Sequence, residues 1–151
     1  MDTPKLSSTV RLAWDGDRRF DVGRPDGPTI RLDGHAITGP SPVDALMSAL
    51  AACTAVDVVD ILAKRRTPLA ALSIDAVGER ATTVPKRIVA VALTYHLTGE
   101  GVDRVHAERA AELAITKYCS VRDSLDPALP IHYSVVLNGE LGATRLAGAS
   151  G

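Results

Sequence analysis

The chain has 151 residues, of which 46% are hydrophobic and 23% are charged, and its formal net charge is −1 at pH 7. This length fits one domain with a sizeable core, and the near-neutral charge gives no electrostatic reason to expect a nucleic-acid partner. The sequence opens without a signal-peptide pattern, and no apolar run approaches the roughly 20 residues of a membrane span. We therefore expect a cytoplasmic protein without a membrane partner. Its two cysteines are then more typical of buried thiols or a redox pair than of a structural disulfide.

The N-terminal third predicts three short strands. Apolar residues alternate with the others over residues 8–14, with Val10, Leu12 and Trp14 on one face. Further strands are expected at 19–22 and 29–32, because stretches rich in Gly, Pro and Asp separate them.

A long helix is predicted next, over residues 43–66. This segment has no Gly or Pro and is rich in Ala and Leu. Its centre, residues 45–59, is apolar apart from a few positions, which are Ser48, Cys53, Thr54 and Asp57. A helix that is apolar nearly all round is typical of a protein interior, so we expect a buried central helix.

The remaining sequence predicts an α+β domain with antiparallel hairpins. A second helix is expected to begin after a capping Asp103, and a short third helix to begin at Cys119. The expected elements are strands at 72–79 and 88–97, helices at 103–118 and 119–125, a strand at 131–137 and a flexible tail at 139–151. We expect a single domain over residues 1–151, with a core at about 8–137.

The two cysteines are the main candidates for chemistry. Cys53 lies in the middle of the long helix, where a free cysteine often serves only packing. Cys119 follows the second helix directly and is expected in the first turn of the next one, where backbone N–H groups and the positive end of the helix dipole favour a thiolate. The two sulfurs would meet if these helices pack side by side, but their spacing in the sequence does not establish that they do.

Asp57 is unusual because it lies one helical turn after Cys53 in an apolar stretch. A buried carboxylate needs partners. Asp57 either accepts structural hydrogen bonds from an Arg, Tyr118 or Ser120, or anchors an Arg near the thiol. The four histidines have no metal-ligand spacing with each other or with the cysteines, so neither a metal nor a cofactor is expected.

Two motifs resemble the osmotically inducible protein C and organic hydroperoxide resistance family. Residues 39–53 are similar to its first-cysteine helix, and residues 117–121 are similar to its second-cysteine motif. The resemblance covers roughly residues 8–137 and is strongest to an uncharacterised branch of the family. It implies an OsmC-like fold in which antiparallel sheets wrap around two central helices, and an intertwined homodimer.

The resemblance also implies an activity. Cys53 would attack an organic hydroperoxide, Cys119 would capture the sulfenic acid as a disulfide, and an external dithiol would reduce that disulfide. Such a reaction stops oxidation before the irreversible sulfinic stage. An alternative is a non-catalytic member of the fold, a dimer that binds a small molecule or senses redox state.

The family's site also uses an N-terminal Arg and a Glu ten residues before the first cysteine. The Arg is interpreted as Arg19, with Arg18 and Arg24 as alternatives. The Glu position holds Val43, which favours the non-catalytic alternative. The neighbouring Asp44 is interpreted as a first-turn carboxylate of the helix. The residues expected to shape the site are Asp57, Arg19, Tyr118 and Ser120.

Overall fold

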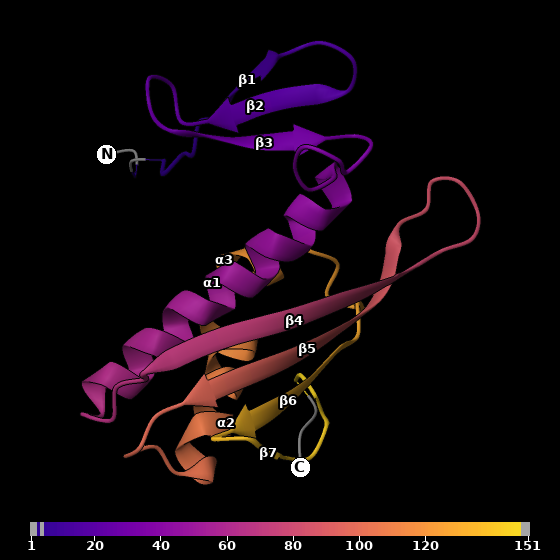
Figure 1. Cartoon of the computed structure of the whole chain (residues 1–151). Helices are drawn as coiled ribbons and strands as arrows, with labels where there is room; N and C mark the ends of the chain where they lie inside the picture. The colour runs from indigo at the N-terminus through magenta and orange to yellow at the C-terminus, as the bar shows by residue number, and fades with distance from the viewer. Residues whose placement is uncertain (1–2, 4, 149–151) are drawn as a thin grey trace. The chain divides into compact units, whose positions relative to one another are not determined.

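The computed structural model describes residue 3 and residues 5–148 (Figure 1), and the chain divides into two compact units. The N-terminal unit reaches to Leu46, and the C-terminal unit begins at Met47. The prediction of a single domain remains a prediction.

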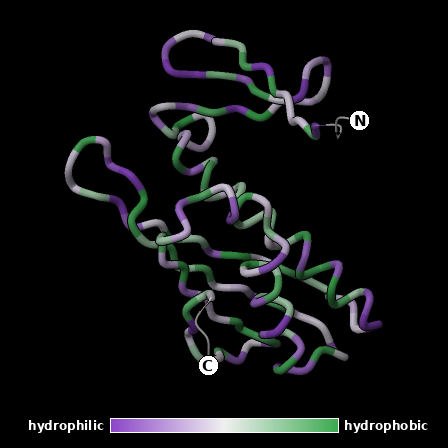
Figure 2. The backbone as a smooth tube through the Cα atoms, turned by 180° about the vertical axis from the view of Figure 1, so that it is seen from behind, coloured by the Kyte–Doolittle hydropathy of each residue, from purple (hydrophilic) through white to green (hydrophobic). Residues whose placement is uncertain are grey.

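The N-terminal unit contains an antiparallel sheet in the order β1-β2-β3, which confirms the three predicted strands. Hydrophobic and hydrophilic residues alternate along β2 and β3 (Figure 2). The first strand is shorter than predicted, because its pairing with β2 ends at Arg11 opposite Gly23. The strands are β1 (Arg11–Trp14), β2 (Arg19–Gly23) and β3 (Thr29–Asp33).

The predicted long helix is α1, Pro42–Lys64. A capping box begins it, because the Ser41 hydroxyl accepts a hydrogen bond from the Asp44 N–H at 3.1 Å and the Asp44 carboxylate accepts one from the Ser41 N–H at 3.0 Å. This confirms that Asp44 serves the start of the helix.

The C-terminal unit is built on a five-stranded sheet in the order β4-β5-β6-β7, with β8 also paired to β6 (Figure 1). One pair departs from the predicted antiparallel arrangement, since β5 and β6 run parallel. The chain between them forms a helical crossover, which is the connection that parallel neighbours need. The strands are β4 (Ala71–Arg80), β5 (Ile88–Thr98), β6 (Ile131–Leu137), β7 (Glu140–Leu141) and β8 (Arg145–Leu146).

The crossover contains three helical segments where the sequence predicts two. Asp103 caps the first of them, as predicted, by accepting a hydrogen bond from the His106 N–H at 2.9 Å. The predicted helix over 103–118 changes to a π-helix in its last five residues. The segments are α2 (Arg104–Leu113), η1 (Ala114–Tyr118) and α3 (Ser120–Asp123).

The segment predicted to be a flexible tail instead forms β7 and β8. Asn138 and Gly139 both have positive φ angles, of 49° and 87°, and turn the chain back from β6 to β7. Asn-Gly is a strong hairpin signal that the tail interpretation overlooked. Arg145 also binds Glu108 on α2, with 2.9 Å between Nη2 and Oε2. Residues 149–151 lie outside the described chain.

The core of the C-terminal unit lies between one face of the sheet and the helices. Alternate residues of β5 and β6 point into it, and α1 contributes five buried residues spaced three or four apart. The buried residues of α1 are Met47, Leu50, Thr54, Val58 and Leu62. Within the described chain α1 is therefore buried along one face, not all round as predicted.

By length and composition alone, α1 is able to cross a membrane. Its most apolar 18-residue window has a mean hydropathy of 1.9, and 28% of that window is buried. This corrects the expectation that no segment is apolar enough. It is weak evidence for a membrane span, because the core helix of a soluble protein meets the same criteria.

Candidate functional site

Cys53 lies near the middle of α1, within the C-terminal unit. Its side chain is half-buried and packs against the core cluster. The buried face of α1 passes through Leu50, Thr54 and Val58, so Cys53 lies at the edge of that face. This position gives the thiol both a packed side and an accessible side.

Cys119 lies at the junction between η1 and α3. Its backbone N–H bonds to the Ala114 carbonyl at 2.9 Å, which is the wide i−5 bond of a π-helix. The Cys119 residue then caps α3, because its sulfur accepts a hydrogen bond from the Arg122 N–H at 3.2 Å. In contrast to Cys53, the Cys119 side chain is buried.

The two thiols lie close enough to interact and are both free. Burial raises the pKa of Cys119 to about 11, the Arg122 N–H opposes this increase, and the Cys53 side chain adds to it. The prediction that the helix start favours a Cys119 thiolate is therefore wrong. The desolvation of the buried sulfur outweighs the hydrogen bond from the helix.

A buried hydroxyl pair lies beside the cysteines and was missed from the sequence. Tyr95 on β5 donates a hydrogen bond to the Thr54 hydroxyl at 2.8 Å, and Thr54 donates to the Ala51 carbonyl at 2.9 Å. Burial raises the pKa of Tyr95, the bond to Thr54 lowers it, and the charge of Cys119 adds to the increase. This pair ties the residue next to Cys53 to the sheet.

The other residues of this unit that are predicted to shape the site lie close to one of the two cysteines in the sequence. Asp57 is half-buried, and within the described residues it has no hydrogen bond or ion pair. Tyr118 is exposed, with the Lys117 ammonium 5.3 Å from its ring centroid. Ser120 begins α3, and its carbonyl accepts a hydrogen bond from the Ser124 hydroxyl at 2.8 Å. Their roles in shaping the site remain predictions.

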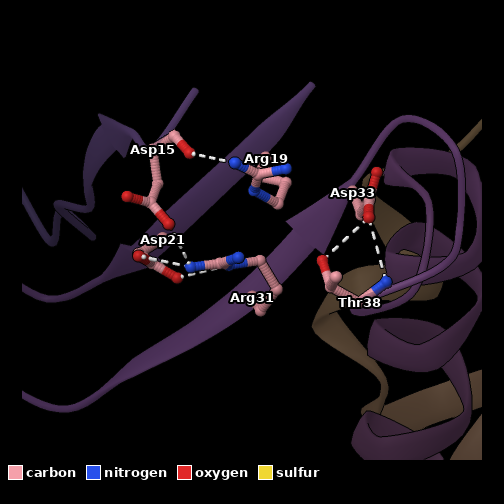
Figure 3. A network of polar contacts seen from close by, with 6 residues as sticks. All are labelled: Asp15, Arg19, Asp21, Arg31, Asp33 and Thr38. Carbon is pink, nitrogen blue, oxygen red and sulfur yellow. Dashed lines mark hydrogen bonds and ion pairs between the residues drawn. The ribbon is translucent and has the colours of Figure 1, made fainter. Parts of the chain in front are cut away.

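Arg19 lies in the N-terminal unit, at the start of β2. Its Nη2 donates to the Asp15 carbonyl at 3.1 Å (Figure 3). The ion pairs in this network belong to Arg31, which binds Asp21 through Nε at 2.8 Å and the Asp15 carboxylate through Nη2 at 2.7 Å. A role for Arg19 at the cysteines, or for Arg18 or Arg24 instead, remains a prediction.

Asp33 organises the turn that follows β3. Its carboxylate accepts hydrogen bonds from the Thr38 N–H at 2.9 Å and the Thr38 hydroxyl at 2.8 Å (Figure 3). It also accepts one from the His35 N–H at 2.8 Å. The Thr38 and His35 hydrogen bonds hold the pKa of this carboxyl well below its usual range. We assign Asp33 a structural role, because all of these bonds lie within its own turn.

In the part of the chain that the structure describes, no three His, Cys, Asp or Glu side chains are grouped so that they could hold a metal ion. The two thiols of the site lie in different surroundings. One is half-buried at the edge of a helix, and the other is buried and held as a neutral thiol at pH 7.

The chain is similar to known proteins in sequence and in fold. A family model described as OsmC-like protein matches residues 33–134. Protein YhfA of Escherichia coli K12 is 30% identical over 126 residues, which cover 83% of this chain and 94% of YhfA. The solved structure of a hypothetical protein from Aquifex aeolicus VF5 has a TM-score of 0.79 at 25% identity, covering 89% of this chain and 98% of that protein.

The solved structure of OsmC from Legionella pneumophila, described as an organic hydroperoxide resistance protein, has the same fold. Its TM-score is 0.61 at 18% identity, over 87% of this chain and 98% of that one. The family match covers more than half of the described residues and includes both cysteines. The chain therefore belongs to the OsmC-like protein family.

Proposed function

We propose that the protein is a thiol-dependent peroxidase that reduces organic hydroperoxides through Cys53 and Cys119. The observation that carries this proposal is the pairing of two free, interacting thiols in unequal environments. The half-buried Cys53 suits the attack on a substrate, whereas the buried Cys119 suits the second step. Membership of the OsmC-like family and the fold shared with a hydroperoxide resistance protein support this assignment.

The proposed reaction begins at Cys53. Its thiolate attacks the outer oxygen of the hydroperoxide, the O–O bond breaks, and the alkoxide takes a proton and leaves as an alcohol. Cys119 then attacks the resulting sulfenic acid, and a disulfide forms as water leaves. Because burial raises the pKa of Cys119 to about 11, this thiol is a poor nucleophile toward the peroxide itself. An external dithiol reduces the disulfide and completes the cycle.

The apolar surroundings of Cys53 support an organic substrate. The neighbouring positions on α1 include Ala51, Ala52 and Ala55, the hydroxyl of the adjacent Thr54 is engaged with Tyr95, and Cys53 packs against the hydrophobic core. An alkyl or aryl group would gain from contact with such a surface, and hydrogen peroxide would not.

The test is hydroperoxide-dependent consumption of dithiothreitol, with cumene hydroperoxide compared with hydrogen peroxide. Wild type should turn over and prefer the organic peroxide, and Cys53→Ser should abolish turnover. Cys119→Ser should leave the first oxidation of Cys53 intact but prevent the disulfide. Non-reducing peptide mapping shows whether the disulfide has formed. Turnover by wild type no faster than by the double serine variant, with both thiols slow toward alkylation, would reject the peroxidase.

Val43 favours a second candidate function. A family Glu that orients the first cysteine is replaced there by an apolar side chain. The protein would then be a non-catalytic dimer that binds a small molecule or senses redox state. The test is to treat the protein with cumene hydroperoxide in excess dithiol. A single round of disulfide formation without turnover would support this function and contradict the peroxidase.

We also propose that the protein acts as a homodimer in the cytoplasm, with neither nucleic acid nor membrane as a partner. Much of the apolar surface of α1 is exposed in the single chain, including Val56 at 60% and Val59 at 45%. A second copy would cover this surface, whereas a bilayer would have to accept Asp57 and Asp60 as well.

Light scattering after gel filtration tests the dimer. Wild type should have twice the mass of the chain, and Val56→Glu should lower the mass toward that of a monomer. Val105→Glu is the matched control, because Val105 is 73% exposed but lies on α2. A monomeric wild type, or equal effects of the two variants, would contradict an α1 interface.

A further inference from the structure

A cavity of about 320 Å³ opens beside Cys119 in the C-terminal unit. Cys119 lines it, and Cys53 is not among the lining residues. Ile115 and Leu125 provide apolar wall, and charges come from Lys117, Arg122 and Asp123. The volume is at the lower end of the range for small-molecule sites, so the cavity suits a compact ligand.

The position of this cavity bears on how a Cys53–Cys119 disulfide would be reduced. In thiol–disulfide exchange the attacking sulfur approaches opposite to the leaving sulfur and forms a mixed disulfide with the sulfur it attacks. Because Cys119 lines this cavity and Cys53 does not, a thiol that enters it would attack Cys119 and release Cys53. We propose that the cavity is the entry site of an anionic dithiol reductant, which attacks Cys119 and releases Cys53.

The inference rests on the proposed function, because it concerns the reductive half of that cycle. A reductant thiolate bonds to the Cys119 sulfur, the Cys53–Cys119 bond breaks, and Cys53 leaves as a thiolate ready for the next peroxide. The second reductant thiol then loses its proton to solvent and attacks the first, forming the reductant's own disulfide. Cys119 leaves in this step and takes up a proton.

Leaving-group chemistry supports the same direction of attack. A thiol with a low pKa leaves faster from a disulfide than one with a high pKa. Burial raises the pKa of the Cys119 thiol, so the opposite route, with attack on Cys53 and departure of Cys119, is disfavoured. The first exchange step, attack on the Cys53–Cys119 disulfide, therefore releases the half-buried Cys53.

The charges of the cavity indicate the class of reductant. Lys117 and Arg122 place two cations on its wall against the single carboxylate of Asp123. The Arg122 guanidinium is fixed there, because it donates to the carbonyl oxygens of Asp126, Pro127 and Leu129 at 3.0, 3.2 and 3.2 Å. A positive wall attracts an anionic molecule and stabilises the attacking thiolate.

The first test locates the attacked sulfur. Protein oxidised with diamide is mixed with mercaptoethanesulfonate, quenched with N-ethylmaleimide and mapped by mass spectrometry. The sulfonate thiol should be found on Cys119 and the maleimide on Cys53, and the reverse pattern would overturn the inference. Failure of diamide to form the disulfide would also overturn it. A disulfide that forms with diamide but not with cumene hydroperoxide would reject the peroxidase alone.

The second test addresses charge, with two dithiols that differ in one group. Reduction of the diamide-oxidised protein is timed with dimercaptopropanesulfonate, an anion, and with neutral dimercaptopropanol. Lys117→Gln should lower the rate ratio of anionic to neutral dithiol roughly threefold, as expected for loss of one exposed charge. Lys86→Gln, in the loop between β4 and β5, is the matched control and should keep the wild-type ratio. An unchanged ratio in Lys117→Gln would overturn the anionic class.

Discussion

Replacing Tyr95 by phenylalanine removes one hydroxyl group from the core beside the two cysteines. That hydroxyl donates to Thr54 at 2.8 Å, and both side chains are fully buried. In Tyr95→Phe the Thr54 hydroxyl keeps its own bond to the Ala51 carbonyl, so the expected loss is that of one hydrogen bond, about 1 kcal/mol. In Thr54→Val the Tyr95 hydroxyl is left buried without an acceptor, which costs about 1–3 kcal/mol.

The two substitutions should therefore lower the free energy of unfolding by unequal amounts, and their effects should not add. The double variant removes both polar groups and should be less destabilised than the sum of the single variants, because no hydroxyl is left unpaired. Urea unfolding of the reduced protein measures all three free energies. Tyr133→Phe is the matched control, since Tyr133 is also buried on β6 but its hydroxyl makes no hydrogen bond among the described residues. A Tyr95→Phe loss no larger than that of Tyr133→Phe, or strict additivity of the pair, would refute the reasoning.

Three further outcomes are expected. The reduced protein should lose roughly 1–2 kcal/mol of unfolding free energy as the pH rises from 9 toward 11, because the pKa of Cys119 is about 11 in the folded chain. Urea titrations of Cys119→Ala should show an unfolding free energy that changes less with pH in this range. The hydrogen bonds that lower the Asp33 pKa should stabilise the fold above about pH 4 and be lost as the pH falls, so acid unfolding of Asp33→Asn should depend less on pH in that range. Glu108→Ala removes the partner of Arg104 and Arg145 and should speed amide exchange in β8, whereas Glu100→Ala, in an exposed turn, should not.

Local signals predicted most of the elements. The absence of Gly and Pro over residues 43–66 was sufficient for α1, and Asp103 correctly indicated the start of α2. The parallel pairing of β5 with β6 was not predictable in this way, because a strand buried on one face has the same alternation in either direction. The β6–β7 hairpin is predictable from Asn138 and Gly139, whereas the Gly, Ala and Ser content of the tail points to a flexible end.

The site was predictable only in part. Both cysteines could be named from their motifs, but their meeting depends on the packing of α1 against the crossover, which spacing does not encode. The Thr54–Tyr95 bond joins residues 41 positions apart and has no local signature. The pKa of Cys119 was predicted in the wrong direction, because the helix start was visible in the sequence and the burial of the sulfur was not.

The π-helix η1 holds one more residue between the Ala114 carbonyl and the Cys119 N–H than an α-helical turn would. Each residue added to or removed from a helix rotates everything after it by about 100°. In η1 the extra residue is absorbed locally, because deleting the exposed Thr116 would let the Cys119 N–H bond to the same Ala114 carbonyl in the ordinary α-helical way. Among relatives, a one-residue gap between α2 and α3 would therefore not by itself separate the two thiols.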